Sequence, residues 1–502
     1  MFFSFDIGVF GVWVVKPLFM PRFRALPPLS SRGLALGSAL STAFLWWLAG
    51  AFSLAPLGWV ALIPFFFWLF GAHAQRRFRF GYLTGFASFA LLNWWLIPTI
   101  SFGALAIKAP LVVGFLLSLV AVTLISAIHA LQVALVAWQS ERKPLWTPLW
   151  CALLWTGLDA LRTISPLAHS WGALAFSQTT DLPILQCASL IGQHGLTFAC
   201  AFVAASLAMG LRTRAKIHFV APAVLLLAMH GYGALVLRGH DASPWSGKRV
   251  LIVQTDVASL VKSGNAQASE TPFDQAFRLT KEATKAARFD LIVWPETTAQ
   301  LGSPSPSSGQ TRRLTGIDLV RLGQLGLSRT SFLIGAEERF LPTQKTRLND
   351  AVLLSFGKNP LGRAKERLVP FGERPPFVEW LPFLAILSPQ PECLPGKNEG
   401  PLPWKNGKIA PLICFESCFP DPAKRLVKEG GQLLVVITND EWFRGTEAPR
   451  QHAAMGVLRA VENGVPLVQC ANGGESFVCD AQGRILAHIP FGEARALGVT
   501  LP

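Results

Sequence analysis

Three short segments in the second half of this 502-residue chain carry residues that could perform covalent acyl chemistry. Glu296 ends the segment Trp-Pro-Glu, Lys365 opens Lys-Glu-Arg-Leu-Val-Pro-Phe-Gly-Glu, and Cys414 ends the apolar run 409–414. A thiol reacts as its thiolate, which a neighbouring cation stabilises and a neighbouring base can produce by accepting the proton. A carboxylate, an ammonium and a thiol held together at separate strand ends would therefore form a nucleophilic site.

Each of the three residues also has a purely structural interpretation. Glu296 could be a surface carboxylate at a strand end, Lys365 a solvated lysine in a charged stretch, and Cys414 an inert core thiol. The catalytic hypothesis therefore requires a fold that brings the three segments together.

The segments lie within a region that reads as alternating strands and helices. Continuous Val, Ile and Leu runs, typical of strands buried on both faces, occur at 249–254, 291–294, 331–335, 349–354, 409–414, 433–437 and 466–470. Helices are expected at 272–287, 315–326, 421–429 and 447–463. This pattern predicts a layered α/β domain in which Glu296 and Cys414 occupy positions where strands meet loops.

The first half of the chain is predicted to lie in a membrane. The sequence is 51% hydrophobic and only 15% charged, and the apolar excess is concentrated before residue 237. With a span requiring about 20 apolar residues, the expected spans are 34–52, 57–73, 81–100, 111–138, 146–161, 187–211 and 217–237. Residues 1–20 are apolar but interrupted by charges, and we assign them no structure. We place the boundary within 240–248, which separates a membrane domain, 1–240, from a soluble domain, 241–502.

Basic residues in alternate loops predict the orientation of this membrane domain. The four basic loops contain Arg22, Arg24 and Arg32; Arg76, Arg77 and Arg79; Arg142 and Lys143; and Arg212, Arg214 and Lys216. Lys and Arg mark the cytoplasmic side, so the soluble domain is expected outside the cytoplasm, in the periplasm of a Gram-negative cell. The net charge of +15 is then an orientation signal and does not indicate nucleic-acid binding.

The longest loop expected on the outer face, 162–186, contains Trp171. Tryptophan is common at headgroup depth, so an interfacial anchor is the simpler interpretation of this residue. The alternative is that Trp171 helps to form a lipid-facing pocket beneath the soluble domain.

In this order, the three segments resemble the Glu-Lys-Cys triad of the nitrilase (carbon–nitrogen hydrolase) superfamily. A multi-span portion followed by such a domain resembles the apolipoprotein N-acyltransferase family, and the similarity covers nearly the whole chain. Further matching segments are Thr438-Asn-Asp-Glu-Trp-Phe443, Gln451-His452 with Arg459-Ala-Val-Glu462, and Ser170-Trp-Gly172 with Ser177-Gln178. The resemblance implies an αββα sandwich for the soluble domain.

The resemblance also implies roles for individual residues. Glu296 would be the general base, Cys414 the nucleophile, and Lys365 the cation that stabilises the oxyanion, together with a backbone amide near Phe415. A phospholipid would donate its acyl group to Cys414, and the N-terminal amine of a lipoprotein would accept it. Neither a metal nor an organic cofactor is implied. By the same resemblance, Glu373 and Glu416 would orient Lys365 and the strand end, Trp442 and Phe443 would wall the acyl pocket, and lipid would enter beside Trp171. The two glutamates could instead be charges at turns or strand edges, and the two aromatic residues could simply belong to the core.

The sequence departs from the family pattern at several positions near the expected acceptor side. Arg363 stands where an aromatic residue is usual, Arg367 replaces a histidine, and the chain ends at Pro502 without the family's usual final span. Alternative functions are therefore a divergent membrane nitrilase of a conjugal-transfer system, a membrane-tethered amidase, and a transport or transfer component that only binds its ligand.

Overall fold

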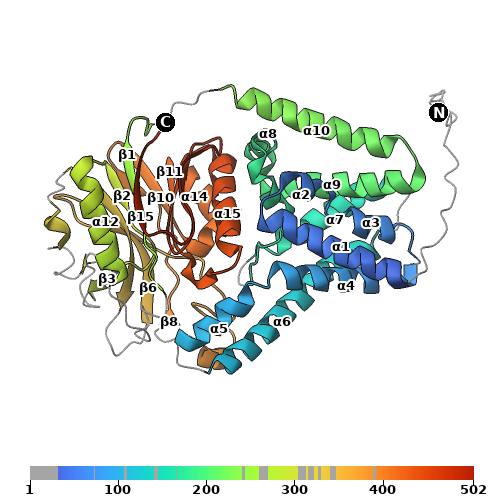
Figure 1. Cartoon of the computed structure of the whole chain (residues 1–502), viewed down its shortest axis with the longest axis horizontal. Helices are drawn as coiled ribbons and strands as arrows, with labels where there is room; N and C mark the ends of the chain where they lie inside the picture. Colours follow the sequence, from blue (N-terminus) through green and yellow to red (C-terminus); the bar gives the residue numbers. More distant parts are fainter. Residues whose placement is uncertain are drawn as a thin grey trace, which may run out of the picture.

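The N-terminal half of the protein is a bundle of helices joined to a two-sheet C-terminal half (Figure 1). The computed structural model describes residues 32–72, 74–106, 110–140, 145–164, 167–239, 244–258, 270–302, 313–314, 321–325, 329–339, 346–387 and 392–502. Residues 1–20 and most of the expected helix 315–326 lie outside these ranges. The helices of the first half are α1 (Arg32–Ala51), α2 (Ala55–Val60), α3 (Ile63–Leu69), α4 (Ala74–Leu92), α5 (Leu96–Ala106), α6 (Leu111–Trp138), α7 (Thr147–Leu161), the 3₁₀ helix η1 (Leu174–Thr180), α8 (Leu182–Gln186), α9 (Ala188–Thr213) and α10 (Ile217–Val236).

A multi-span helical membrane domain is confirmed, but fewer segments than the seven predicted reach spanning length. Within the described ranges, four helices are long and apolar enough to cross a membrane: α1, α6, α9 and α10. The predicted span 81–100 falls in a helix pair, Gln75–Leu92 with Leu96–Gly103, that bends by 53°. The predicted span 57–73 is divided between α2 and α3, because Pro64, in the first turn of α3, has no backbone N–H to continue the helix from α2. The predicted span 146–161 contains the 15-residue helix α7.

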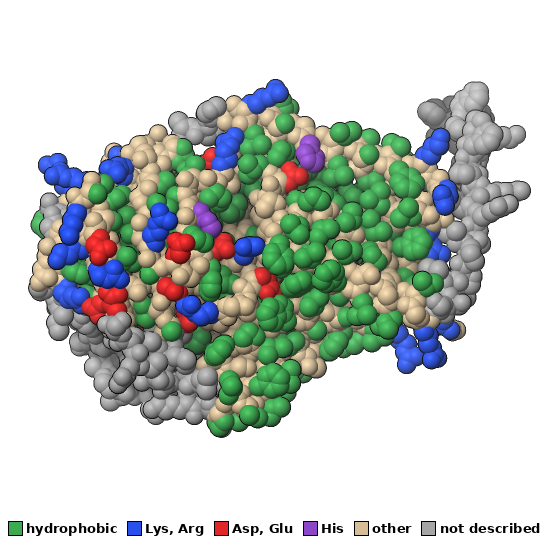
Figure 2. Space-filling view, in the orientation of Figure 1, with side chains coloured by type: hydrophobic (Ala, Val, Ile, Leu, Met, Phe, Trp, Pro, Cys, Tyr) green, Lys and Arg blue, Asp and Glu red, His purple; other side chains and the backbone are tan. Residues whose placement is uncertain are grey.

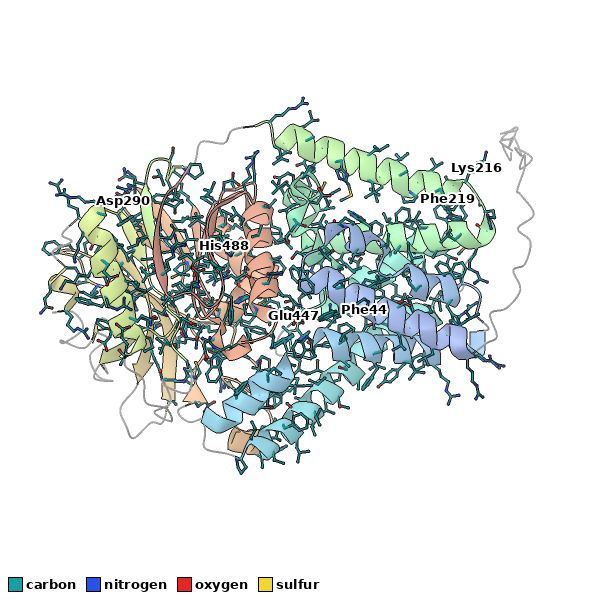
Figure 3. The ribbon with its side chains drawn as sticks, viewed as in Figure 1. Phe44, Lys216, Phe219, Asp290, Glu447 and His488 are labelled. Carbon is teal, nitrogen blue, oxygen red and sulfur yellow. The ribbon has the colours of Figure 1, made fainter. Side chains whose placement is uncertain are left out.

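Basic and apolar side chains occupy different parts of the helical half. α1 begins at Arg32, the first turns of α4 contain Arg76, Arg77 and Arg79, and α10 follows Lys216 directly. Figure 2 shows Lys and Arg side chains at the end of the helical half farthest from the sheets, and a broad hydrophobic surface nearer to them. Figure 3 places Lys216 at this far end. The helical half thus has an apolar surface bounded by a basic end.

Two sheets form the centre of the C-terminal half. The larger sheet has the strand order β15 (Arg495–Thr500), β1 (Arg249–Gln254), β2 (Leu291–Val293), β5 (Ser331–Arg339), β3 (Ala299–Gly302) and β4 (Arg313–Leu314). Three more strands extend it from β5: β6 (Thr346–Ser355) pairs with β5, and β7 (Leu361–Ala364) and β8 (Glu392–Cys393) pair with β6. The smaller has the order β14 (Ile485–Ile489), β13 (Ser476–Cys479), β12 (Leu467–Asn472), β11 (Leu433–Asn439), β10 (Gly407–Ile413) and β9 (Leu402–Trp404). Neighbouring β1, β2 and β5 are parallel, as are β10, β11 and β12.

The alternation of buried side chains along these strands shows how the layers pack. In β1, Val250 and Ile252 join a core shared by both sheets, whereas Leu251 and Val253 pack on the side of α12 (Pro272–Ala286). In β11, Leu433 and Val435 face the shared core, and Leu434 and Val436 belong to a core that includes α14 (Pro420–Lys428), α15 (Ala448–Asn463) and the membrane helices. Because successive side chains of a strand point to opposite faces of its sheet, both faces of each sheet are buried. The predicted αββα sandwich is confirmed.

All seven predicted strands are present. In the described ranges, the structure contains eight further strands that were not predicted: β3, β4, β7, β8, β9, β13, β14 and β15. Most are short or half-exposed, so their residues lack the continuous apolar run used to find the others. The remaining short helices of this half are η2 (Pro382–Leu387), η3 (Cys414–Cys418) and η4 (Asp440–Phe443).

A carboxylate from the sandwich joins the two halves at the start of α15. The indole N–H groups of Trp47, on α1, and Trp94, after α4, both donate to Oε1 of Glu447, at 2.9 and 2.7 Å. Figure 3 shows Glu447 at the junction of the two halves. Hydrogen bonds to a charged group contribute about 1.5–3 kcal/mol.

Replacing Glu447 with alanine is therefore expected to destabilise the joined structure by about 1.5–3 kcal/mol, since both indole donors lose their acceptor. Thermal unfolding of the detergent-solubilised protein measures the change. The matched control is Glu493→Ala, which removes an exposed carboxylate paired to Arg495 at 3.8 Å and should change stability by at most about 1 kcal/mol. Equal effects of the two substitutions would contradict the prediction.

Candidate active site

The carboxylate of Glu296 lies between the two sheets. β2 is completely buried and leads through Trp294 and Pro295 to Glu296, whose side chain is also buried. Oε1 accepts a hydrogen bond from Nδ2 of Asn349 at 2.6 Å, and Oε2 accepts one from the backbone N–H of Asn439 at 2.8 Å. Asn439 ends β11 of the other sheet. These contacts hold both carboxylate oxygens in place.

A glycine allows the neighbouring strand to approach Glu296 closely. A β-carbon on Gly335, in β5, would lie 2.2 Å from the carbonyl oxygen of Pro295 and 2.4 Å from Cα of Glu296. Both distances are far shorter than a van der Waals contact, so any larger residue at Gly335 would displace the backbone that carries the carboxylate.

The ammonium of Lys365 forms ion pairs with two carboxylates. Lys365 follows β7, and only 1% of its surface is exposed. Its Nζ lies 2.9 Å from Oε1 of Glu373 and 3.4 Å from Oε1 of Glu296. Burial alone would lower the pKa of Lys365, but these two carboxylates outweigh it and raise the pKa well above the usual range. The lysine is therefore a fixed positive charge.

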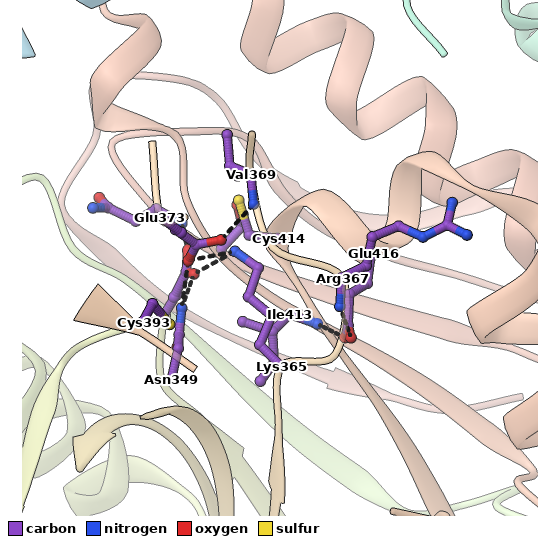
Figure 4. Close-up of polar contacts among 12 residues, drawn as sticks. Asn349, Lys365, Arg367, Val369, Glu373, Cys393, Ile413, Cys414 and Glu416 are labelled. Atoms are coloured by element: carbon purple, nitrogen blue, oxygen red, sulfur yellow. Dashed lines mark hydrogen bonds and ion pairs between the residues drawn. The ribbon is translucent and has the colours of Figure 1, made fainter. Parts of the chain in front are cut away.

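Glu373 connects this lysine to the loop that follows it. In addition to Lys365, Oε1 of Glu373 accepts from Nδ2 of Asn349 at 3.3 Å, and Oε2 accepts from the backbone N–H of Val369 at 2.8 Å (Figure 4). Asn349 therefore donates to both glutamates that contact the lysine. Glu373 thus ties the ammonium of Lys365 to the backbone of the following loop.

Cys414 occupies the sharp turn after β10. It begins η3 and has a φ of +50°, a left-handed conformation that costs a non-glycine residue about 1–2 kcal/mol. Such a turn lifts the side chain out of the strand, and the residue remains partly exposed although Ile413 and Phe415 are buried. In the view of Figure 4 its sulfur atom lies near the ammonium nitrogen of Lys365, and the two groups interact electrostatically.

The resting thiol is expected to be protonated at neutral pH, because burial and the Glu296 carboxylate raise the pKa of Cys414 to about 12 against the opposing effects of Lys365 and His452. Alkylation of Cys414 by iodoacetamide should therefore be slow near neutrality and accelerate about tenfold per pH unit. Lys365→Met removes a cation, raises the thiol pKa further and should slow alkylation at every pH. Peptide mass spectrometry measures the rate.

The control is Lys405→Met, which removes a lysine from a half-exposed ion pair with Asp290 and should leave the pH dependence of alkylation unchanged. A rate that levels off below about pH 9 would contradict the prediction.

A buried ion pair links the strand of Lys365 to the turn of Cys414. The side chains of Arg363 and Glu416 have no solvent exposure, and two hydrogen bonds of 2.7 and 3.1 Å join them. The Glu416 carboxylate also accepts from the backbone N–H groups of Ile413 and Glu366, each at 2.8 Å. Burial alone would raise the pKa of Glu416, but Arg363 and these donors lower it. Arg363, a departure from the family pattern, thus neutralises the charge of Glu416.

Aromatic residues from both halves meet beside the nucleophile. Trp171 is 3% exposed, which does not fit the simpler interpretation of an anchor at the bilayer surface. Its ring stacks on Phe415 with centroids 6.3 Å apart and contacts Trp95 at 5.1 Å. Trp95 in turn contacts Phe443 edge-on at 5.1 Å. Trp442 is half-buried in η4. Phe443 and Trp171 are thus brought close to the site.

Sequence reasoning did not identify Asn349, Asn439 or the partner of Glu416. Asn349 was expected only as the first residue of a strand, and Asn439 contacts Glu296 through its backbone, which no side-chain motif reveals. Among the described residues, no group of three or more His, Cys, Asp or Glu side chains could hold a metal ion.

Comparisons with known proteins identify both halves of the chain. Residues 37–206 match the family model of the apolipoprotein N-acyltransferase N-terminal domain, and residues 253–501 match that of carbon–nitrogen hydrolase. An apolipoprotein N-acyltransferase of Geobacter metallireducens is 32% identical over 95% of this chain and 90% of its own length. One of Chlorobaculum tepidum is 26% identical over 99% and 92%.

The chain also aligns with a solved structure of an amidase from Nesterenkonia sp., at 20% identity and a TM-score of 0.37, over 51% of this chain and 91% of that chain. Two family models in the expected order and a relative similar over almost its full length identify the family without reference to individual site residues. The protein belongs to the apolipoprotein N-acyltransferase family of the carbon–nitrogen hydrolase superfamily.

Proposed function

We propose that this protein transfers a fatty acyl group from a phospholipid, through a thioester on Cys414, to the N-terminal amine of an apolipoprotein. The observation that carries the proposal is the position of the nucleophile at the junction of the two halves. Phe415, the next residue, stacks on Trp171 of the membrane half. A thiol at this junction can meet an ester from the bilayer and an amine from outside it.

In the first half-reaction, Glu296 accepts the Cys414 proton as Sγ attacks the ester carbonyl of the phospholipid. Lys365 and the backbone N–H of Phe415 stabilise the negative oxygen of the tetrahedral intermediate. The C–O bond then breaks, the departing alcohol takes the proton from Glu296, and lysophospholipid leaves a thioester on Cys414.

In the second half-reaction, the amine of the apolipoprotein attacks the thioester carbonyl and gives a proton to Glu296. The C–S bond breaks, an amide forms, and the returning proton restores the Cys414 thiol. Glu296 suits both steps because Asn349 and Asn439 hold its carboxylate in one position.

An apolar hollow on the membrane half supports phospholipid as the donor. It lies open between α5 and α6 and is lined by residues that include Trp94, Ile97, Phe102, Leu111 and Phe115, the last three of which are about half exposed. Trp94 also contacts Glu447 at the junction of the halves. A hollow of this composition suits an acyl chain.

We also propose an inner-membrane location with the catalytic half in the periplasm. The ends of α1, α4 and α10 that carry Lys and Arg lie away from the sheets (Figure 1), where Figure 2 shows Lys and Arg side chains. The positive-inside rule assigns this end to the cytoplasm. The catalytic half then lies on the opposite face.

The decisive experiment is mass spectrometry of the purified protein after incubation with a phospholipid of defined acyl chains. The expected result is an adduct of one acyl mass on the Cys414 peptide, which a lipopeptide with a free N-terminal amine discharges. An unmodified thiol would overturn the acyltransferase proposal in favour of a binding role. An adduct that water discharges but the amine does not would favour a hydrolase.

A further inference from the structure

A buried histidine lies directly behind the nucleophile, on the helix that faces the membrane half. His452, in α15, is 1% exposed. Its Nδ1 lies 2.9 Å from Oδ1 of Asp440, and its Nε2 lies 3.1 Å from the carbonyl oxygen of Cys414 and 2.8 Å from Oγ of Ser417. None of the catalytic steps described above uses this imidazole.

The partners of the two ring nitrogens define how many protons the imidazole carries. A carbonyl oxygen only accepts hydrogen bonds, so the contact with Cys414 requires a proton on Nε2. Oδ1 of Asp440 already accepts from the hydroxyl of Thr438 at 2.7 Å, so the contact at Nδ1 requires a second proton. Ser417 donates to the Cys414 carbonyl at 2.9 Å, which leaves its lone pairs facing Nε2. A neutral ring could accept the Ser417 hydroxyl at Nε2, but its lone pair would then lie 3.1 Å from the carbonyl oxygen of Cys414, and that carbonyl would lose both side-chain donors. An imidazolium shares its Nε2 proton between the carbonyl and Oγ of Ser417 and keeps every contact.

The charges around the ring support this protonation state. The groups facing it are Asp440 from η4 and the thiols of Cys414 and Cys418 from η3, while the ring of Trp171 lies at 6.5 Å on the membrane side. Burial alone would lower the pKa of His452, but Asp440 in particular raises it well above the usual range.

The hydrogen bond from His452 to the Cys414 carbonyl affects the backbone N–H of Phe415, because both groups belong to the same peptide. The carbonyl of Cys414 and the N–H of Phe415 belong to one planar trans peptide and point in opposite directions. Donors that hold the carbonyl therefore also fix the direction of the N–H, and a cationic donor polarises the peptide, making that N–H a stronger donor. Two donors, from His452 and Ser417, hold this carbonyl.

We infer that His452 is a permanently protonated positioning residue that locks and polarises the Cys414–Phe415 peptide so that the Phe415 N–H can serve the oxyanion. The inference deepens the proposed function and rests on it. The same contact stabilises the left-handed conformation of Cys414, and the imidazolium adds a second positive charge, after Lys365, near the thiol. His452 touches no substrate atom and acts only through the peptide and the electrostatic field.

The first test is His452→Gln, which keeps a hydrogen-bond donor but removes the charge. We expect iodoacetamide alkylation of Cys414 to slow about tenfold at every pH, which is the effect of a thiol pKa raised by about one unit. Acyl-enzyme formation in a single turnover should slow by about 10–100-fold, less than the loss of an oxyanion donor itself. The control is His488→Gln, at an imidazole 44% exposed and 3.4 Å from Glu475, which should leave both values unchanged.

The second test is Asp440→Asn, which removes the partner that keeps the imidazole charged. Acyl-enzyme formation should then fall as the pH rises through about 6.5 or below, where His452 loses a proton, whereas the wild-type protein shows no transition there. A residue that only fills space would not create this transition.

Two results would overturn the inference. The first is a folded His452→Gln variant whose alkylation and acylation rates equal those of the wild type. The second is an Asp440→Asn variant whose acylation rate depends on pH as the wild-type rate does. If His452→Gln does not fold, the Asp440→Asn profile decides. If the wild-type protein forms no acyl adduct, the proposed function fails, but the alkylation profile of His452→Gln still tests the imidazolium.

Discussion

Replacing Cys414 with alanine is expected to abolish acyl transfer, lowering the rate by on the order of 10⁴–10⁶-fold. The loss is this large because Lys365 and Glu296 act only on the reaction of Sγ and on the intermediate that it forms, so neither has a function once the thiol is gone. The measurement is acylation of a synthetic lipopeptide by the purified protein in phospholipid vesicles. The variant should express, insert and unfold as the wild type does.

The matched control is Cys479→Ala, which removes a buried thiol from β13 of the smaller sheet. This variant should lose some stability but keep its activity. Cys414→Ser is a useful intermediate, because a hydroxyl is a poorer nucleophile than a thiolate but keeps the shape of the site. Lipopeptide acylation by Cys414→Ala at more than a trace of the wild-type rate would refute the covalent mechanism.

Replacing Arg363 with methionine is expected to destabilise the protein by about 3–5 kcal/mol, because it leaves the Glu416 carboxylate buried without its counter-ion. Arg363 lies two residues before Lys365, and Glu416 two residues after Cys414. The substitution should therefore also loosen the geometry between cation and nucleophile. Thermal or denaturant unfolding measures the first effect, and acyl-enzyme formation the second.

A double-mutant cycle separates the charge from the packing. In a Glu416→Gln background, Arg363→Met leaves no buried carboxylate without a counter-ion, so it should cost clearly less than it does in the wild type. Arg444→Met is the control for loss of an ion pair at the surface. Its guanidinium is 42% exposed between Asp256 and Glu441, and its loss should cost at most about 1 kcal/mol. Equal costs for Arg363→Met in both backgrounds would show that the ion pair does not stabilise the fold.

The sequence predicted the strands that carry the site, because strands buried on both faces must be continuously apolar. β2, β10 and β11 were each recognisable in this way, and their polar final or following residues include Glu296, Cys414 and Asn439. The sequence was less reliable for the membrane half. Hydropathy measures apolar composition and not helix continuity, so it did not reveal the breaks within 57–73 or the 53° bend after α4.

The contacts that make these residues a site were decided only by tertiary structure. Asn349 meets Glu296, Arg363 meets Glu416, and His452 meets the carbonyl of Cys414 across separations of 53, 53 and 38 residues. A local pattern carries no information about such distant pairs, because their distances depend on how two sheets and an outer helix pack together. Composition and periodicity thus determined a membrane-attached, layered α/β domain, and the order of three short motifs pointed to its reactive residues. Packing alone decided which charges are paired, which carbonyl is held, and how the thiol faces the junction with the membrane.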